Sequence, residues 1–494
     1  MSAGAIFDRG RTESQCFTAL AVLLVLVRGA AFARAESLSF DSEQAIVGLM
    51  AKHLSELRTF PLFTYGQHYQ LGVESWLIAP LFAMFGPSVA AMRVPLVVIN
   101  AAVAGMLVWM AHTALGLRPA VGFLATMPFI FPTPVMAITL LENTGSAVEP
   151  LLYVLLLWLL RRRPFAFGAL FAFGFLHREF TVFALPALAL VSVAEPFRWH
   201  AGTLKRAAMA AGGILLVALV VDDAKMRANG TSLLMQAQML SNDMCVEGPH
   251  TLMARVRYLF TPTLPVLGGG IELSLHDLGK RSPEVVGSSL VGWAVGAGLL
   301  FMLMRILWLA RSSAARLKAA FGVYLAVIGA CALAAYPLAC GGAINTFPVL
   351  RYLTLATLLP TGLFATYAVL ECSRYARAAM MGVFIFWGAA NLWDNARVLY
   401  QANMAPEPDP RRELTEFLLS HKIHFARASF WDAYAVDFLS NEQVIVGSYV
   451  VSRIPEYERL VDEQGAAAAN IERMPCQGQF YVAAWCIQVA AGRP

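Results

Sequence analysis

Apolar runs of membrane-spanning length recur along this chain and limit what it can fold into. A helix needs about 20 mostly apolar residues to cross a bilayer, because every backbone polar group in the hydrocarbon core must be bonded within the segment. The chain therefore predicts a mainly α-helical, polytopic membrane bundle of about 11 spans, some of them short. They are expected near 16–33, 93–113, 120–138, 146–160, 164–177, 180–195, 206–222, 287–310, 319–338, 349–371 and 377–393.

Composition supports the same class of protein. Of the 494 residues, 58% are hydrophobic and only 14% are charged. A soluble chain of this length carries roughly 25% charged residues. The formal net charge of +5 does not indicate nucleic acid as a partner, because the basic residues lie mainly in short segments between apolar runs. The expected environment is a lipid bilayer.

The basic residues also predict an orientation. By the positive-inside rule, the side of the membrane that carries them is cytoplasmic. An odd number of spans then places the N-terminus in the cytoplasm and the C-terminus outside, in a multi-pass protein of a bacterial inner membrane. The first run is interpreted as a retained anchor rather than a cleaved signal, since Asp8 and Glu13 dilute the basic segment before it. The basic clusters are Arg9 and Arg11, Arg118, Arg161–Arg163, Lys205 and Arg206, Arg311, Arg316 and Lys318, and Arg374 and Arg377.

Two parts of the chain are expected. Residues 1–393 form a transmembrane module with a first outer loop at 34–92 and a central outer loop at 223–286, and residues 394–494 form a tail outside the membrane. An amphipathic helical stretch and two alternating runs predict a small α+β fold for the tail. Cys476 and Cys486 flank the second of these runs and could form a disulfide in an oxidising compartment, or remain two thiols.

The first outer loop begins with a helix signal. Asp41, followed three residues later by Gln44, is typical of a capping box, and the apolar stripe after it predicts a helix lying on the membrane surface. Two roles stay open for Asp41. It caps the helix, or it acts as a general base or as a carboxylate that holds a cation against a phosphate. The two roles are compatible, because a helix N-terminus keeps a carboxylate still and ionised.

A longer pattern in this loop resembles that of a known family. The loop is similar to the first periplasmic loop of C-type (GT-C) membrane glycosyltransferases, in particular the bacterial enzymes allied to protein O-mannosyltransferases and to the lipid A aminoarabinose transferase. The tail stretch from Phe430 to Tyr434 is also similar to the tails of this bacterial group. The first-loop residues that carry the resemblance are Asp41, Glu43, Val47–Ala51, Tyr65–Gln67, Tyr69, Gly72, Glu74, Phe85–Ser88 and Arg93.

The resemblance implies an activity and a set of site residues. It implies transfer of a hexose or pentose from a polyprenyl-phosphate donor to a lipid, glycan or protein acceptor on the outer side. Asp41 is then the catalytic carboxylate, with Glu43 beside it, and a divalent cation (Mg2+ or Mn2+) could be held by Asp41 and Glu142. The other first-loop residues expected to bind substrate are Tyr65, Gln67, His68, Tyr69, Glu74 and Arg93. One departure is that the stretch YQLGVESW lacks the lysine of the aminoarabinose transferase, so other residues must hold the donor phosphate.

Basic residues beside apolar runs are candidates for that task. His177 and Arg178 separate two apolar runs, and Arg351 begins another. A guanidinium group binds phosphate oxygens through two parallel hydrogen bonds, which favours the two arginines as phosphate ligands. The alternatives are an ordinary loop with an Arg178–Glu179 pair, and arginines that extend from a helix end to the membrane surface.

Two other functions were weighed against the enzyme. A transporter or flippase would carry broken helices with ionisable residues near the bilayer midplane and related repeats in its two halves. Here the polar residues gather at the expected outer ends of the helices, and the long first loop has no inverted partner. An inactive scaffold of the same fold is the remaining alternative, although the acidic pattern is intact.

Overall fold

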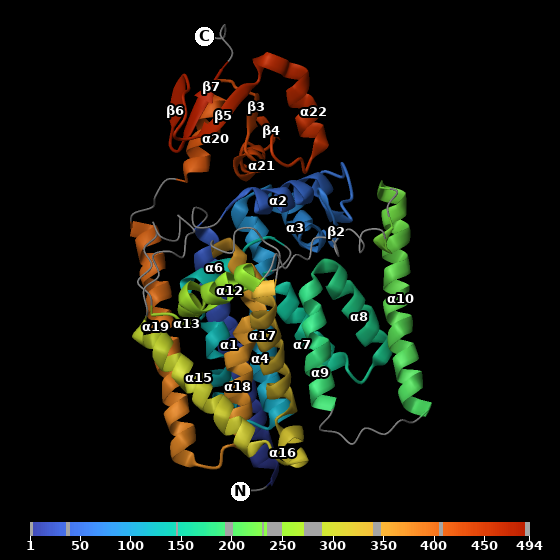
Figure 1. Cartoon of the computed structure of the whole chain (residues 1–494), viewed down its shortest axis with the longest axis vertical. Helices are drawn as coiled ribbons and strands as arrows, with labels where there is room; N and C mark the ends of the chain where they lie inside the picture. Colours follow the sequence, from blue (N-terminus) through green and yellow to red (C-terminus); the bar gives the residue numbers. More distant parts are fainter. Residues whose placement is uncertain are drawn as a thin grey trace. The chain divides into compact units, whose positions relative to one another are not determined.

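The structure is a computed structural model of the whole chain (Figure 1). It describes residues 3–35, 40–144, 147–192, 201–229, 232–234, 249–270, 289–338, 347–404 and 409–489. Contacts divide the chain into two compact units. The helix-bundle unit comprises Met1–Phe32, Val97–Leu141 and Ser146–Gln401, and the loop–tail unit comprises Ala33–Leu96, Glu142–Gly145 and Ala402–Pro494. The first outer loop thus belongs to the same unit as the tail, and the predicted division at residue 393 stays a prediction.

The helix-bundle unit confirms the predicted helical membrane fold. Six helices are long and apolar enough to cross a membrane: Thr12–Arg34, Val89–Leu115, Gly202–Arg227, Leu290–Leu309, Ala320–Leu338 and Leu350–Leu370. Five further apolar helices in the described chain have 10 to 17 residues: Val73–Phe85, Pro119–Ile130, Glu149–Leu160, Pro164–His177 and Glu179–Ser192. The number of about 11 spans stays a prediction, because short helices cross a bilayer only in a sheltered position.

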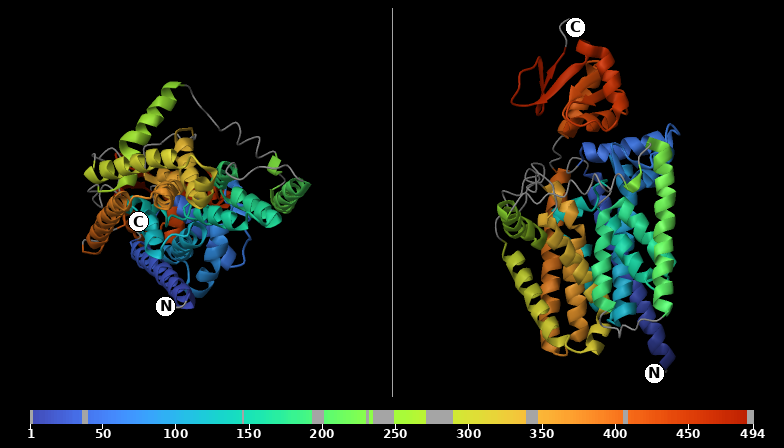
Figure 2. Two further views of the ribbon diagram at one scale, coloured as in Figure 1. Left: turned by 90° about the horizontal axis from the view of Figure 1, so that it is seen from below. Right: turned by 45° about the vertical axis from the view of Figure 1, so that its right-hand side comes forward.

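Helices that carry or extend the bundle are as follows, and Figure 2 shows the long ones running side by side. They are α1 (Ala3–Arg34), α4 (Val89–Leu115), α5 (Pro119–Ile130), α6 (Pro134–Thr139), α7 (Glu149–Leu160), α8 (Pro164–His177), η2 (Glu179–Phe183), α9 (Ala184–Ser192), α10 (Ala201–Asn229), α12 (Pro249–Tyr258), η3 (Leu259–Thr263), α13 (Leu264–Gly268), α15 (Leu290–Leu309), α16 (Ser313–Lys318), α17 (Ala320–Ala335), η5 (Tyr336–Leu338), η6 (Phe347–Thr357), α18 (Leu358–Leu370) and α19 (Arg374–Met404).

Proline and glycine explain two local features of this bundle. The run predicted as one span at 120–138 is divided into α5 and α6, because Pro132 and Pro134 cannot continue a helix while Pro134 suits the first turn of the next one. Glycines let α17 and α18 approach closely. A Cβ atom added at Gly362 would lie 2.3 Å from the backbone nitrogen of Ala326, which is far inside van der Waals contact.

The loop–tail unit contains the first-loop elements and a small α+β fold. The first loop forms α2 (Ser42–Ser55), β1 (Phe63–Thr64), β2 (Gln67–Leu71) and α3 (Val73–Phe85). The tail forms α20 (Pro410–Ser420), β3 (Phe425–Ala428), α21 (Phe430–Leu439), β4 (Ile445–Ser448), α22 (Pro455–Gln464), η7 (Gly465–Ala467), β5 (Ala469–Arg473), β6 (Phe480–Val482) and β7 (Trp485–Gln488). Its five strands have the order β4-β3-β5-β7-β6. The predicted α+β tail is therefore confirmed, and Cys476 and Cys486 form the predicted disulfide.

Strand pairing in the tail is mixed. β3 pairs in parallel with β4 and β5, whereas β7 pairs antiparallel with β5 and β6. The parallel pairs require helical crossovers, which α21 and α22 supply between the strands. The helix α21 also contacts α2 of the first loop. A Cβ atom added at Gly48 of α2 would lie 2.6 Å from Cε2 of Phe438, so the absence of a side chain at Gly48 permits this close packing.

Candidate functional site

Asp41 precedes α2 and caps its first turn. Its Oδ1 accepts a hydrogen bond from the backbone N–H of Gln44 at 3.1 Å, and the residue is 4% exposed. The capping role predicted from the sequence is therefore confirmed. The free N–H groups and the dipole of the helix favour the ionised carboxylate, which is the form that can accept a proton. The catalytic role of Asp41 stays a hypothesis.

The other acidic candidates of the loop–tail unit lie close to helix starts. Glu43 is half-buried in the first turn of α2, and Glu74 is buried in the first turn of α3. Glu142 is also buried, and its neighbours Asn143 and Thr144 are bonded to the first loop. The side chain of Asn143 donates to the carbonyl of Met92 at 3.1 Å, and Gln70 donates to the carbonyl of Thr144 at 3.0 Å. The structure thus brings the segment of Glu142 to the first outer loop.

Arg93 has a structural environment. It lies in α4, is 2% exposed, and donates through Nη1 to the carbonyl oxygens of Ala33 and Ala35 at 3.4 and 3.2 Å. It therefore holds the chain that follows α1, and it does not extend towards a membrane surface as a snorkelling arginine would.

The remaining first-loop candidates lie on or beside the β1–β2 hairpin. The hydroxyl of Tyr65 is 3.0 Å from Nδ1 of His53, and burial raises the pKa of this phenol. In β2, Gln67 is half-buried and Tyr69 is exposed. The backbone of His68 is part of β2, but its side chain lies outside the described part of the structure. Of these four residues, Tyr65 is the one with a printed contact to a second titratable side chain, that of His53.

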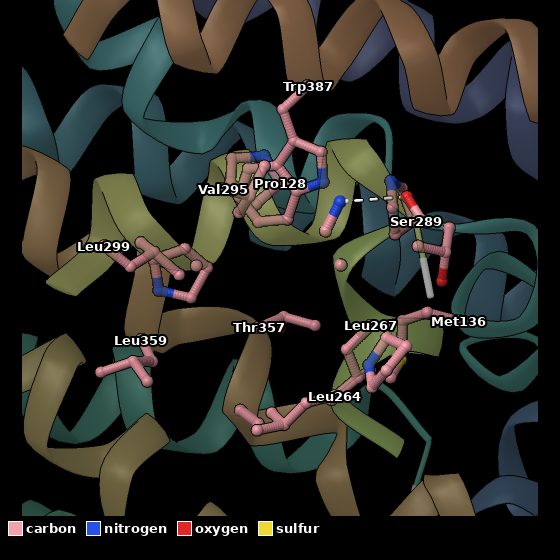
Figure 3. A pocket seen from close by; sticks show the side chains of 18 of the residues that line it. Pro128, Met136, Leu264, Leu267, Ser289, Val295, Leu299, Thr357, Leu359 and Trp387 are labelled. Atoms are coloured by element: carbon pink, nitrogen blue, oxygen red, sulfur yellow. Dashed lines mark hydrogen bonds between the residues drawn. The ribbon is translucent and has the colours of Figure 1, made fainter. Parts of the chain in front are cut away.

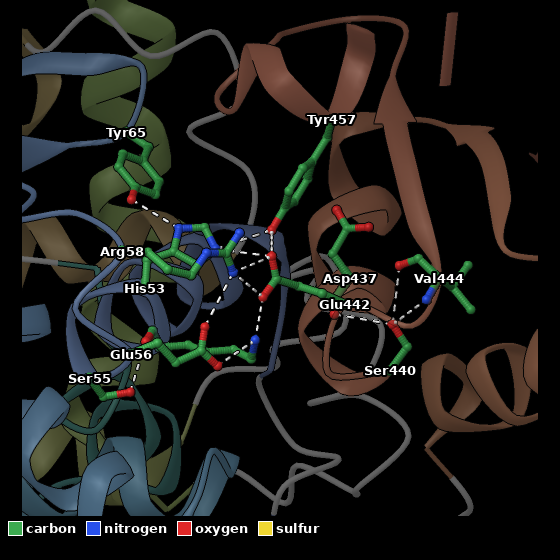
Figure 4. A network of polar contacts seen from close by, with 11 residues as sticks. His53, Ser55, Glu56, Arg58, Tyr65, Asp437, Ser440, Glu442, Val444 and Tyr457 are labelled. Carbon is green, nitrogen blue, oxygen red and sulfur yellow. Dashed lines mark hydrogen bonds and ion pairs between the residues drawn. The ribbon is translucent and has the colours of Figure 1, made fainter. Parts of the chain in front are cut away.

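A polar network that the sequence did not indicate continues from His53 (Figure 4). Its centre is Glu442, which follows α21. Nε2 of His53 lies 3.1 Å from Oε1 of Glu442, and Arg58 and the hydroxyl of Tyr457 donate to the same carboxylate at 2.9 and 2.7 Å. Lys52 also pairs with Glu442. Burial alone would raise the pKa of Glu442, but the hydrogen bonds from His53, Lys52 and Tyr457 outweigh it and hold the pKa well below its usual value.

In the helix-bundle unit, two predicted phosphate ligands come together. The guanidinium carbons of Arg178 and Arg351 lie 5.9 and 5.2 Å from the centroid of the same ring, that of Tyr352. Arg178 is buried and Arg351 is half-buried. Beside Arg178, Nδ1 of His177 is 2.7 Å from the hydroxyl of Tyr153. The Arg178–Glu179 loop pair considered from the sequence has no printed ion pair among the described residues, whereas the convergence of the arginines concentrates positive charge.

The same unit contains an apolar cavity of about 680 Å³ (Figure 3). Residues from six separate stretches of the chain line it, among them Met136, Leu264, Val295, Leu359 and Trp387. The polar groups in its wall are few, and Ser289 uses its hydroxyl to donate to the carbonyl of Gly269 at 2.6 Å. A cavity of this size and chemistry suits a hydrocarbon chain rather than a sugar.

The described residues do not contain a group of three or more His, Cys, Asp and Glu side chains placed to hold a metal ion. Asp41 and Glu142 remain as two carboxylates of the loop–tail unit. Mg2+ is usually held by one or two carboxylates together with substrate phosphates, so a divalent cation stays a prediction for this pair.

No family model matches this chain, and no curated protein matches it. Solved structures similar to the chain include ArnT from Cupriavidus metallidurans in the apo state, with a TM-score of 0.45, 12% identity, and coverage of 98% of each chain. ArnT bound to undecaprenyl phosphate gives a TM-score of 0.42, 11% identity, and coverage of 96% of this chain and 99% of that one. The archaeal oligosaccharyltransferase AglB from Archaeoglobus fulgidus, in complex with an inhibitory peptide and a dolichol-phosphate, gives 0.42, 11%, 92% and 69%. The resemblance to GT-C glycosyltransferases indicated by the first loop is thus accompanied by a structural likeness.

Proposed function

We propose that this protein is a membrane glycosyltransferase that moves a sugar from a polyprenyl-phosphate donor to a hydroxyl acceptor. The observation that carries the proposal is the convergence of Arg178 and Arg351 on the ring of Tyr352, in the unit that also contains the apolar cavity. A lipid-linked sugar phosphate has a long hydrocarbon chain and an anionic head, and these two features match its chemistry.

The arginines would bind the phosphate and stabilise it as the leaving group. As the bond between the anomeric carbon and the phosphate oxygen breaks, the electron pair goes to the phosphate, whose growing charge the two guanidinium groups neutralise. A phosphate bound in this way is already a good leaving group, so binding and orientation supply much of the acceleration. The hydrocarbon chain of the donor would occupy the apolar cavity.

Asp41 would act as the general base. The acceptor oxygen attacks the anomeric carbon with inversion while its proton passes to the carboxylate of Asp41. Glu43, Glu74 and Glu142 would orient the acceptor, and the proposed mechanism assigns no step to a cation. Which sugar is transferred, and whether the acceptor is a lipid, a glycan or a protein, follows from the experiment below.

The test is release of free polyprenyl phosphate by the protein purified into lipid nanodiscs. A panel of polyprenyl-phosphate hexoses and pentoses serves as donors, and a membrane lysate supplies acceptors. We expect turnover by the wild type and a loss of more than about 100-fold in Asp41→Asn, with donor binding unchanged. Asparagine also caps helices well, so this variant keeps the fold of α2.

The matched control is Asp409→Asn. Asp409 caps α20 in the same manner, accepting from the backbone N–H of Arg411 at 3.0 Å. It should retain full turnover. Donor binding without turnover by the wild type across the whole panel would refute the enzyme and favour a transporter or scaffold. Equal turnover by wild type and Asp41→Asn would leave the enzyme but reduce Asp41 to a helix cap.

A further inference from the structure

The tail contacts both neighbours of Asp41. Arg411, in α20, donates through Nη1 to the carbonyl oxygen of Phe40 at 3.1 Å. The backbone N–H of Ala435, in α21, donates to the hydroxyl of Ser42 at 3.2 Å. Residues on each side of the candidate base are therefore bonded to a part of the chain about 370 to 390 positions away.

Arg411 is itself held in place. Its Nε lies 3.7 Å from Oδ1 of Asp432, a carboxylate that is 2% exposed, while its own side chain is 18% exposed. Asp432 lies in the first turn of α21, the helix that supplies the contact to Ser42. A single tail helix thus anchors both of the bonds that fix the start of α2.

The other end of α2 is held through Glu442. Lys52 and His53 in the last turn of α2, and Arg58 just beyond it, all pair with the Glu442 carboxylate. These contacts are partly buried: the side chains of Lys52, His53 and Glu442 are 7%, 5% and 10% exposed. Three basic groups around one carboxylate, with few competing waters, make a stronger attachment than an exposed surface pair.

The backbone that presents Glu442 is in a costly conformation. Asn441 and Glu442 have φ angles of 55° and 62°, in the left-handed region that residues with a side chain seldom occupy. Two such residues in succession persist where surrounding contacts compensate for the strain. Here the compensating contacts include the four hydrogen-bonding partners of Glu442 in α2, the segment after it and α22.

We propose that Arg411 and Glu442 are positioning residues that grip α2 at its two ends, and so hold the carboxylate of Asp41 in its reactive orientation. The grip extends along the helix, since Phe438 packs against Gly48 between the two ends. The role in turnover rests on the proposed glycosyltransferase function, whereas the grip itself does not. Neither residue touches the reacting atoms in this scheme.

The grip is tested by hydrogen exchange of the α2 backbone in the full-length protein. We expect Glu442→Gln to speed exchange at the C-terminal turn of α2, and Arg411→Met to speed it at the first turn. The control is Glu463→Gln, which breaks an exposed pair with Arg459 inside α22 and should leave α2 unchanged. Unchanged exchange of α2 in both positioning variants would refute the grip, whether or not the protein is a transferase.

Positioning is tested by turnover with a donor-binding count. The number of molecules that bind donor measures the folded fraction, and turnover per binding site then reports orientation alone. We expect Glu442→Gln to lower this kcat about 10- to 100-fold, the scale for a misplaced catalytic group, with the donor KM unchanged. The acid side of the kcat–pH profile should also shift, because the carboxylate of Asp41 loses its fixed environment.

Conservative variants complete the test. Tyr457→Phe removes one hydrogen bond to Glu442 and should give a smaller loss than Glu442→Gln. Glu442→Asp keeps the charge and should recover part of the rate. Faster exchange with full kcat and an unshifted pH profile would overturn the positioning role and leave a purely structural contact. If the wild type shows no turnover, the proposed function fails, and hydrogen exchange still decides the grip.

Discussion

Asp432 and Arg473 form a two-pronged ion pair in the tail. Nη2 and Nε of Arg473 donate to Oδ1 and Oδ2 of Asp432 at 2.6 and 2.9 Å, and the aspartate is 2% exposed. Asp432 belongs to the stretch Phe430–Tyr434, which the sequence singled out for its resemblance to other tails. In this structure its carboxylate joins α21 to β5 and, through Arg411, to the chain before Asp41.

We predict that Asp432→Asn lowers the free energy of unfolding of the loop–tail unit by about 2–3 kcal/mol, because the buried acceptors of charged hydrogen bonds are lost. Burial raises the pKa of Asp432, but the hydrogen bonds and charge of Arg473 lower it further, to a value below 3.8. A carboxyl whose pKa is lowered on folding stabilises the fold above its unfolded-state pKa. The stability difference should therefore be full near neutral pH and shrink as the pH falls below 3.8.

Thermal melting of wild type and variant in detergent, followed at several pH values, checks this prediction. The matched control is Asp462→Asn, since Asp462 pairs with Arg427 at 2.8 Å on the surface, with side chains 63% and 42% exposed. An exposed pair contributes less than about 1 kcal/mol. Similar losses in the two variants would contradict the buried-pair explanation.

A second prediction concerns Asp437, which is completely buried in α21. Its Oδ1 accepts the backbone N–H of Val446 at 2.6 Å, while Oδ2 has no hydrogen-bond partner among the described residues. Burial raises its pKa well above 3.8, and the charges of Glu442 and Glu458 add to this. The folded protein therefore keeps a proton that the unfolded chain releases, and stability falls as the pH rises above the unfolded-state pKa of about 4.

We expect Asp437→Asn to remove this loss. The amide oxygen still accepts from Val446, but the side chain does not titrate. From pH 4 upwards, and until the folded group ionises, the wild type should lose up to about 1.4 kcal/mol per pH unit relative to the variant. Melting temperatures from pH 4 to pH 8 measure the two slopes. Parallel slopes would show that Asp437 is ionised in the folded protein already.

The sequence predicted those features that depend on nearby residues. Apolar runs predicted helices because a bilayer permits few other structures, and the Asp41-to-Gln44 spacing predicted a cap whose donor is three residues away. The alternating runs predicted the strands of the tail. The disulfide followed from Cys476 and Cys486, which are 10 positions apart. In each case the interacting groups lie within one element or its neighbour.

The contacts that organise the candidate site could not be predicted in this way. His53 and Glu442 are separated by 389 positions, and neither residue has a local pattern that marks its partner. The sequence also assigned Tyr65 to substrate binding, but its contact with His53 depends on the turn that follows α2. The meeting of Arg178 and Arg351 at Tyr352 likewise requires the packing of separate helices.

A third prediction concerns the disulfide. Cys476 lies before β6 and Cys486 lies in β7, so the bridge closes the β6–β7 hairpin. Closing a loop of this length restricts the unfolded chain, and Cys476→Ser should cost about 2–3 kcal/mol of stability. Melting with and without a reductant measures it. Reduction should lower the melting temperature of the wild type and of Cys16→Ser, an exposed free thiol, but leave Cys476→Ser unchanged. A Cys476→Ser protein that melts with the oxidised wild type would contradict the prediction.

The last prediction tests the apolar cavity as the place of the donor chain. Gly292 of α15 lines the cavity, and a Cβ atom added there would meet its nearest neighbour at 3.8 Å, so a side chain is tolerated. We expect Gly292→Phe to occupy the cavity and to weaken binding of a long polyprenyl phosphate by more than about tenfold, or 1.4 kcal/mol. A phosphate with a short chain, which needs only the arginines, should bind equally to both proteins. Gly382→Phe in α19 is the control, since Gly382 has open space but is not among the residues that line the cavity. Isothermal titration in nanodiscs gives the affinities. An equal loss for short and long chains would show that the substitution disturbs the phosphate site, and no loss for either would place the hydrocarbon chain elsewhere.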